Sequence, residues 1–237
     1  MKDASPTTFY LKDYAPFPFR VKNVHLTFQL DPLKTRVISL VEFEPIAGSS
    51  QHYLFLHDED LRLIWAKIDG AAVSPQITKG GLSVRVPSAS FVWECEVEID
   101  PQNNTSLEGL YMSNGMYCTQ CEAEGFRKIT YYPDRPDVMA QFHVRIEGDL
   151  PILLSNGNPK AQGENPNFSP HSFLELLMST PTIRSAPAIF APCSTLRPIP
   201  PRPNTTTVSP GWNGHMLTTV SGLRLSYYDQ CTHPSPH

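Results

Sequence analysis

The residues with the clearest potential for chemistry lie in the segment Tyr117–Val138, which reads YCTQCEAEGFRKITYYPDRPDV. Cys118 and Cys121 are separated by two residues, and the glutamates Glu122 and Glu124 follow directly. The CxxC spacing is typical of zinc knuckles and redox dithiols. The two glutamates by themselves are consistent with solvated carboxylates in a polar loop. The segment therefore offers metal or redox chemistry at its cysteines as alternatives to simple packing.

The cysteine spacing by itself does not favour a metal or redox site. A structural zinc site needs four ligands, and no second CxxC pair completes this one. A thioredoxin-like motif stands at a strand-to-helix junction in an α/β pattern, which this β-rich sequence lacks. The five cysteines are also an odd number, which argues against a fully paired disulfide framework. We therefore interpret Cys118 and Cys121 as reduced thiols that pack as small apolar side chains.

Catalytic signatures are missing from the rest of the sequence. A zinc peptidase motif HExxH would place two imidazoles on one helix face, but the sequence contains none. His233 and His237 have the right spacing, yet Pro234-Ser235-Pro236 between them forbids a helix. No GxSxG elbow or GxxxxGK[ST] phosphate loop is present, and no GxGxxG follows a strand. The acidic run at 57–60 (HDED) lies between two apolar runs and is predicted to be a solvated connecting loop.

The elements that must position these residues are predicted to be strands. Apolar residues alternate with polar ones, most clearly over Phe91–Ile99, where Glu94, Glu96 and Glu98 form the opposite face. Similar patterns occur at Val24–Leu30, Thr35–Phe43, Leu82–Val86 and Ala140–Ile146. An Asn-Gly pair at 114–115 predicts a tight hairpin turn. The sequence thus predicts a mainly β fold, an antiparallel β-sandwich or saddle-shaped sheet.

Composition changes near Glu164. No lysine follows Lys160, and only two of the 23 acidic residues lie beyond Glu164. We predict two parts: a β-domain over 1–164 and an irregular, low-order tail over 165–237, rich in Pro, Ser and Thr. The only helix-like pattern in this tail is Phe173–Met178.

Charge and hydropathy exclude two classes of partner. The net charge is −4, and no Lys/Arg cluster is dense enough to follow a phosphate backbone, so we expect no nucleic-acid partner. The N-terminus lacks the apolar stretch of a signal peptide, and no run of about 18 apolar residues occurs. We expect a cytoplasmic protein without a membrane partner.

The motif CTQCEAEGF, together with LEGLY at Leu107–Tyr111 and LLSNGN at Leu153–Asn158, resembles the N-terminal domain of bacterial aminopeptidase N. That family comprises zinc-dependent gluzincin aminopeptidases, which remove N-terminal amino acids from peptides. The resemblance implies that Glu122 binds the α-amino group of the substrate, with Gln120 and Glu124 as neighbours.

The same resemblance implies that zinc belongs to a catalytic domain of the complete enzyme. This chain has neither HExxH nor the family's GxMEN motif, so we expect no catalytic residue, no metal ligand and no cofactor in it, and no peptidase activity of the chain alone. Its expected partners are that missing catalytic domain and the N-terminus of a peptide. The segment 134–137 (DRPD) is assigned a structural role, as a turn with a local ion pair.

The resemblance ends at Glu164, where the composition also changes. This coincidence suggests that the tail is translated in a shifted reading frame and that the β-domain is incomplete. Translation of the encoding DNA in all frames tests this hypothesis. The alternative function is a non-catalytic β-sandwich binding module whose Pro-rich tail recruits a partner.

Overall fold

The structure is a computed structural model that describes residues 10–47, 52–122, 124–150, 152–164, 172–180 and 189–192. These residues form strands and two short 3-10 helices, η1 (Leu11–Asp13) and η2 (Phe126–Lys128). The prediction of a mainly β fold is therefore confirmed. Most of the predicted tail, including all of 193–237, lies outside the described residues.

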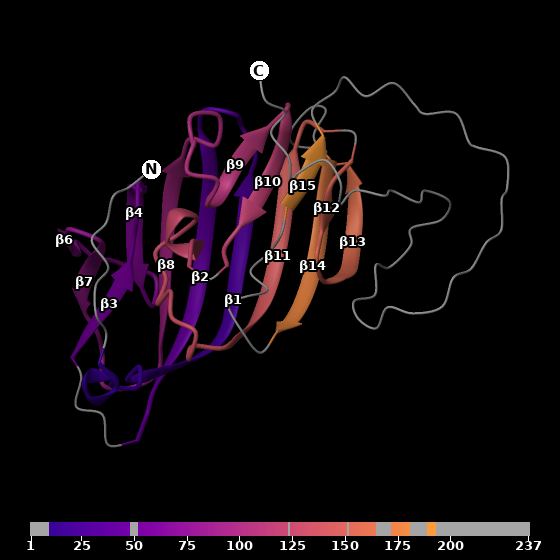
Figure 1. The fold of residues 1–237 in the computed structure, drawn as a ribbon. Coiled ribbons are helices and arrows are strands. Elements are labelled where there is room, and N and C mark those ends of the chain that lie inside the picture. Colours follow the sequence, from indigo (N-terminus) through magenta and orange to yellow (C-terminus); the bar gives the residue numbers. More distant parts are fainter. Residues whose placement is uncertain are drawn as a thin grey trace, which may run out of the picture. The chain divides into compact units, whose positions relative to one another are not determined.

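The largest element is an eight-stranded sheet, visible as the row of long arrows in Figure 1. In spatial order its strands are β13 (Asn158–Glu164), β14 (Ser172–Thr180), β11 (Ala140–Gly148), β1 (Phe19–Gln29), β2 (Thr35–Pro45), β8 (Phe91–Ile99), β4 (Arg62–Ile68) and β5 (Ala71–Ala72). The parallel pair β1–β11 lies inside the sheet, whereas the other neighbouring strands run antiparallel.

Two smaller sheets share a hydrophobic core with the large one. The first has the order β12 (Leu154–Ser155), β15 (Ile189–Pro192), β10 (Met116–Gln120) and β9 (Gly109–Ser113). The second has the order β3 (Tyr53–His57), β7 (Gly81–Arg85) and β6 (Gln76–Thr78). Buried residues from all three sheets, such as Val24, Leu54 and Leu110, belong to one cluster. Burial of this apolar surface is the main force that holds the sheets together.

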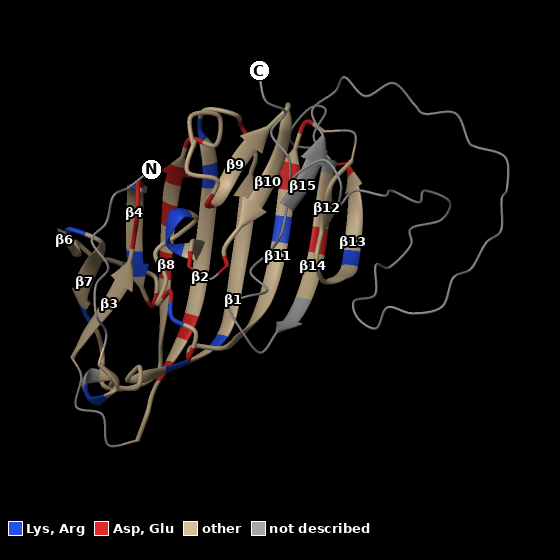
Figure 2. Ribbon diagram, viewed as in Figure 1, with Lys and Arg blue, Asp and Glu red and all other residues tan. Residues whose placement is uncertain are grey.

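Strand β8 follows its predicted pattern with one exception. The apolar face from Phe91 to Ile99 is buried, as alternation requires. On the opposite face Glu96 is buried as well, because it bonds to Arg36 on β2 and to the indole nitrogen of Trp65 on β4. Charged groups of both signs lie along the strands of the large sheet (Figure 2). Cross-strand pairs such as Arg36–Glu96 connect neighbouring strands on this face.

The predicted hairpin turn is confirmed between β9 and β10. Asn114 has φ 47° and Gly115 has φ 76°. A two-residue turn of type I′ needs positive φ at both positions, and Asn-Gly is the pair that adopts them at least cost. This turn fixes the register that brings Gly109 opposite Gln120 at the other end of the hairpin.

The helix-like assignment of Phe173–Met178 is wrong, because these residues belong to strand β14. Leu174 and Leu176 are buried while Phe173 and Glu175 are half-buried, which is the period of two of a strand. Beyond Glu164, β14 still pairs with both β11 and β13. The large sheet therefore continues past the predicted boundary, whereas the shifted reading frame stays a prediction.

Candidate functional site

The glutamate singled out by the sequence lies on the loop between β10 and η2. Cys121 at its start is buried, whereas Gln120, Glu122 and Glu124 are exposed. Glu122 makes no hydrogen bond or ion pair within the part of the chain that the structure describes. Its carboxylate is therefore available to a ligand, while the residue next to it anchors the loop in the core.

Gly125 closes the loop at its other end. It has φ 149°, a conformation that residues with a side chain rarely adopt. A Cβ atom at this position would lie 2.9 Å from the carbonyl oxygen of Gln120 and 3.2 Å from Cα of Cys121. The two ends of the loop are therefore in close contact, and only glycine fits between them. Glu122 projects from a loop whose base is narrow and buried.

A buried carboxylate holds this base. Oδ2 of Asp134 accepts hydrogen bonds from the backbone N–H of Gly125 at 3.2 Å and from Nε of Arg127 at 2.7 Å. Arg127 in turn forms an ion pair of 2.7 Å with Glu124. The side chain of Asp134 is 1% exposed, so its charge is compensated by these donors rather than by water. Of the two candidate glutamates, Glu124 is thus engaged by Arg127.

The turn predicted at 134–137 contains the expected local ion pair. Arg135 and Asp137 form a bidentate contact, with distances of 2.8 and 2.7 Å. This pairing lowers the pKa of the Asp137 carboxyl below its ordinary value, chiefly through the hydrogen bond from Arg135. The first residue of the turn, Asp134, differs from this expectation because it is buried and serves the loop that carries Glu122.

The acidic run at 57–60 connects β3 to β4, as predicted, but it is more than a solvated turn. Nδ1 of His57 accepts a hydrogen bond from the backbone N–H of Asp134 at 3.2 Å. Glu59 forms an ion pair of 2.9 Å with Nζ of Lys128, whose side chain is 6% exposed. Burial lowers the pKa of His57, and the positive charge of Arg127 lowers it further. These contacts fasten η2 and the segment that follows it to the end of β3 and to the connection after β3.

The cysteines of the CxxC motif are buried, and they form no disulfide among the residues that the structure describes. Burial raises the pKa of the Cys121 thiol far above its ordinary value, and the carboxylate of Asp134 adds to the effect. A thiol in such surroundings is a poor nucleophile and a poor metal ligand. The described residues contain no group of three or more His, Cys, Asp or Glu side chains that could bind a metal ion. They therefore do not fit a catalytic zinc.

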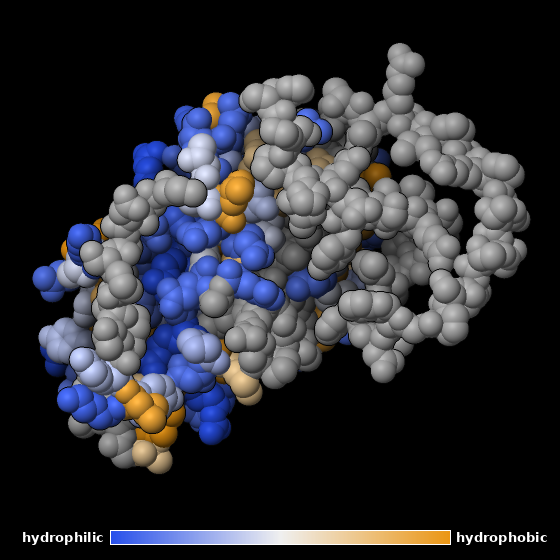
Figure 3. Space-filling model, viewed as in Figure 1, coloured by the Kyte–Doolittle hydropathy of each residue, from blue (hydrophilic) through white to orange (hydrophobic). Residues whose placement is uncertain are grey.

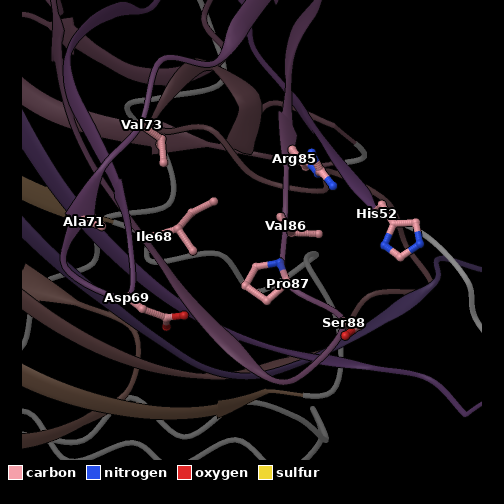
Figure 4. A pocket seen from close by; sticks show the side chains of 9 residues that line it. All are labelled: His52, Ile68, Asp69, Ala71, Val73, Arg85, Val86, Pro87 and Ser88. Atoms are coloured by element: carbon pink, nitrogen blue, oxygen red, sulfur yellow. The ribbon is translucent and has the colours of Figure 1, made fainter.

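The candidate site is an exposed loop rather than a closed pocket within this chain. An open cavity of about 710 Å³ lies elsewhere, near the β4–β5 turn and the end of β7, and Figure 4 shows His52 and Arg85 on one side of it and Asp69 on the other. A second cavity of about 270 Å³ is lined by Lys128 and does not include Glu122. On the face shown in Figure 3 the described side chains are mostly hydrophilic, and hydrophobic ones stand in small groups.

Sequence reasoning found the loop but missed the residues that hold it. Gln120, Glu122 and Glu124 lie together, as their spacing requires. The contribution of Asp134, Arg127 and Lys128 depends on contacts with residues up to 77 positions away. The one available signal was the presence of charged residues within an aromatic, apolar stretch, since such residues need buried partners.

In the described residues no helix is long and apolar enough to cross a membrane.

Known proteins are similar to this chain over about two thirds of its length. Aminopeptidase N of Caulobacter vibrioides is 46% identical over 168 residues, which cover 69% of this chain and 19% of that protein. Aminopeptidase N of Escherichia coli is 43% identical over 166 residues, which cover 68% and 19%. The chain thus spans about a fifth of the length of these curated relatives. The resemblance to bacterial aminopeptidase N is confirmed.

Solved structures agree with this similarity. Legionella pneumophila aminopeptidase A, in complex with aspartic acid, has a TM-score of 0.70 and 27% identity, covering 77% of this chain and 22% of that one. The M1 zinc metallopeptidase from Deinococcus radiodurans has a TM-score of 0.64 at 15% identity, covering 74% of this chain and 42% of that one, and shows the fold alone. The peptidase M1 N-terminal domain matches residues 21–180. This match extends over β14 and covers more than half of the sequence, so the chain belongs to the peptidase M1 N-terminal domain family.

Proposed function

We propose that this domain forms one wall of the substrate site in a zinc aminopeptidase that removes N-terminal amino acids from peptides. Glu122 is the residue of this wall that binds the α-amino group of the substrate. The observation that carries the proposal is an exposed carboxylate without a described partner on a loop whose base is closed by Gly125 and Asp134. The relatives' name, aminopeptidase N, supports the substrate class.

The chemistry of the wall is recognition rather than bond cleavage. An aminopeptidase must recognise the ammonium group at the end of a peptide, and a carboxylate binds it through a charge-assisted hydrogen bond. Because the base of the loop is fixed, little conformational entropy is lost when the ammonium binds. Gln120 and Glu124 flank the ammonium position, and the pair between Glu124 and Arg127 leaves Glu122 as the ligand.

The complete enzyme would add a domain that holds zinc. When bound, zinc activates the water that attacks the peptide carbonyl. This chain contains no HExxH motif, so its part in the reaction is confined to holding the substrate, and we expect no hydrolysis by the chain alone. A peptide N-terminus and the catalytic domain are its proposed partners, and the proposed location is cytoplasmic. The family match does not favour the alternative of an unrelated binding module.

A chimera tests the role of Glu122. The 168 matching residues of Caulobacter vibrioides aminopeptidase N are replaced by those of this chain. We then compare hydrolysis of an aminoacyl p-nitroanilide by the chimera and by its Glu122→Gln and Glu124→Gln variants. Loss of a hydrogen bond to a charged group costs about 1.5–3 kcal/mol, so Glu122→Gln should lower kcat/KM by about 10- to 100-fold.

Glu124→Gln is the matched control. It removes a carboxylate from the same loop but only breaks an exposed ion pair, which is worth at most about 1 kcal/mol. We expect kcat/KM of this variant to fall by less than about fivefold. Equal losses in the two variants would show that Glu122 has no special role in binding the amine.

A further inference from the structure

Two histidines form a pair on the surface of the large sheet. His25 on β1 and His143 on β11 lie directly opposite each other in the parallel register of these strands. Their ring centroids are 4.4 Å apart, and the ring planes are within 9° of parallel. His25 is exposed and His143 is half-buried, so both rings face outward from a pair of central strands. The amine-binding loop makes no use of either ring.

The strands hold this pair in place. Val24, Leu26, Phe142 and Val144 flank the two histidines in sequence, and all four are buried in the core. The positions of the two Cα atoms are therefore set by core packing. Ligands on packed strands are held more tightly than ligands on loops, which is the requirement for a preorganised site.

The charged groups around the pair carry opposite signs. Nδ2 of Asn23 donates a hydrogen bond of 2.7 Å to Oε2 of Glu42, which lies two residues along β2 from Leu40, the partner of His25 in the register. The negative charge of Glu42 and the positive charge of Lys160 on β13 both act on the His143 ring. The carboxylate would favour a bound cation, and the ammonium group would oppose it.

We propose that His25 and His143 bind a divalent transition-metal ion, with one nitrogen of each imidazole as a ligand and water in the remaining positions. Imidazole is a preferred ligand of nickel, copper and zinc, whereas magnesium and calcium prefer oxygen. Two nitrogens that bind one ion at about 2.1 Å lie about 3.0–3.4 Å apart. The rings are stacked with centroids 4.4 Å apart, so each must turn about its Cβ–Cγ bond for one nitrogen of each ring to reach the same ion.

The ion would have two ligands from the chain, both of them imidazoles in their neutral form when it is bound. Since the described residues offer no third ligand in a recognisable group, the ion should exchange with solvent rather than remain permanently bound.

The test is a titration of the full 237-residue chain with nickel chloride at pH 7.5, followed by two-dimensional amide NMR. Nickel is paramagnetic, so it broadens the signals of nearby amides and thereby separates this site from the other six histidines. We expect the signals of Val24, Leu26, Phe142 and Val144 to broaden together at low nickel concentration. Magnesium chloride should leave them unchanged.

Variants decide whether the two rings act as a chelate. The second imidazole of a chelate binds at a high effective concentration, so loss of either ring should weaken nickel binding by about 100-fold. His25→Gln and His143→Gln should therefore show the same loss of broadening on β1 and β11, whereas the exposed His52→Gln should behave as the unchanged chain. The proposal is overturned if the amide signals of β1 and β11 still broaden in His25→Gln or in His143→Gln. It is also overturned if nickel does not preferentially broaden the signals of these two strands in the unchanged chain.

Discussion

Nε of Arg127 lies 2.7 Å from Oδ2 of Asp134, and the same oxygen accepts the backbone N–H groups of Gly125 at 3.2 Å and Arg127 at 3.3 Å. Three donors thus converge on one buried carboxylate oxygen. One donor belongs to Gly125, which ends the loop carrying Glu122, and the other two belong to Arg127 in η2. The position of the exposed carboxylate of Glu122 is therefore set by the buried carboxylate of Asp134, 12 residues further along the chain.

Replacement of Asp134 by asparagine should strongly destabilise the chain. The variant keeps the shape of the side chain but leaves the charge of Arg127, which is 22% exposed, without its buried partner. Breaking a buried ion pair by removing one member costs about 3–5 kcal/mol, and the exposed fraction of Arg127 places the expected loss near about 3 kcal/mol. Urea denaturation followed by tryptophan fluorescence measures this loss.

Asp137→Asn provides the matched control for this prediction. It breaks the ion pair with Arg135, whose side chains are 29% and 26% exposed. Such a pair contributes at most about 1 kcal/mol. If the two variants lost the same free energy of unfolding, Asp134 would not be the buried centre of the loop.

Gly125→Ala should disturb the loop, and Gly80→Ala shows how much of the effect is backbone strain alone. Both glycines have positive φ, at 149° and 86°. A Cβ on Gly80 meets nothing within 4 Å, whereas one on Gly125 lies 2.9 Å from the carbonyl oxygen of Gln120. We expect a loss of about 1 kcal/mol at Gly80 and at least about 3 kcal/mol at Gly125, because steric overlap adds to the strain.

The two glycine variants also differ in their expected effect on the proposed site. In the chimera, Gly125→Ala should lower kcat/KM because the loop can no longer close beneath Glu122, whereas Gly80→Ala should leave it unchanged. Thermal denaturation and the aminoacyl p-nitroanilide assay measure the two effects separately. An equal loss of stability in both variants would contradict the close contact between the ends of the loop.

Strand positions followed from the sequence where apolar and polar residues alternate clearly. The alternation over Phe91–Ile99 predicts β8 with its bounds, because a period of two is imposed by burial of every second residue. The same rule fails for Phe173–Met178, since LELLM offers apolar residues at both helical and strand spacings. These residues form a strand because they pair with β11 and β13. Local periodicity cannot predict such pairing, because it does not report contacts with other strands.

The sequence pointed to the exposed residue of the candidate site but not to the residues that hold its loop in place. Glu122 stands beside a recognisable motif, so its position is readable from the sequence. The partners Asp134 and His57 are 77 residues apart, and only the fold brings them together. Glu96 shows the same limit of sequence-based prediction. The alternation along β8 predicts that Glu96 is exposed, whereas Arg36 and Trp65 from neighbouring strands bury it.

Tyr132→Phe should stabilise the chain slightly. The hydroxyl group of Tyr132 is buried and has no hydrogen-bond partner in the described part of the chain, and the nearby carboxylate of Asp134 raises its pKa further than burial alone. A buried polar group without a partner costs about 1–3 kcal/mol, so its removal should raise the free energy of unfolding by about 1 kcal/mol. Urea denaturation measures the change.

The neighbouring Tyr131→Phe should have the opposite sign. The Tyr131 hydroxyl interacts with the carboxylate of Asp58, and burial raises its pKa to about 12. Loss of this hydrogen bond should lower the free energy of unfolding by about 1 kcal/mol. Destabilisation by Tyr132→Phe would mean that its hydroxyl has a partner after all.

Stability should fall as the pH decreases below about 6.5. Burial and Arg127 lower the pKa of His57 from its ordinary value of 6.5. Between the folded and the unfolded pKa, the unfolded chain binds more protons, so the free energy of unfolding rises with pH and is lost on acidification. His143 acts in the same direction because burial lowers its pKa too.

His57→Asn separates this contribution from the others. Asparagine can still accept the hydrogen bond from Asp134 but does not titrate. The free energy of unfolding of the variant should depend less steeply on pH between 5 and 6.5, with a difference of at most about 1.4 kcal/mol per pH unit. Urea denaturation at a series of pH values measures both slopes. Identical slopes for the variant and the original chain would show that His57 is not held neutral by the fold.

Truncation tests the division of the chain at Glu164. A chain that ends after Glu164 loses β14, which lies between β11 and β13 and contributes the buried Leu174 and Leu176. Without β14, strand β13 has no partner strand among the described residues, and the edge of β11 is exposed. We expect this chain to aggregate or to unfold without a cooperative transition.

A chain that ends after Pro192 is the matched control, because it keeps both β14 and β15. It should unfold cooperatively, with the same thermal midpoint as the full chain. The reason is that β14 still covers apolar surface in the eight-stranded sheet and β15 still pairs in the four-stranded sheet. Calorimetry and light scattering on the three chains measure the difference. If the shorter chain unfolded with the same midpoint, β14 would contribute nothing to the core, and the predicted end of the β-domain at Glu164 would be supported. If only the chain that ends after Glu164 loses its cooperative transition, β14 is required for the fold that holds Glu122. The functional end of the domain then lies beyond β14.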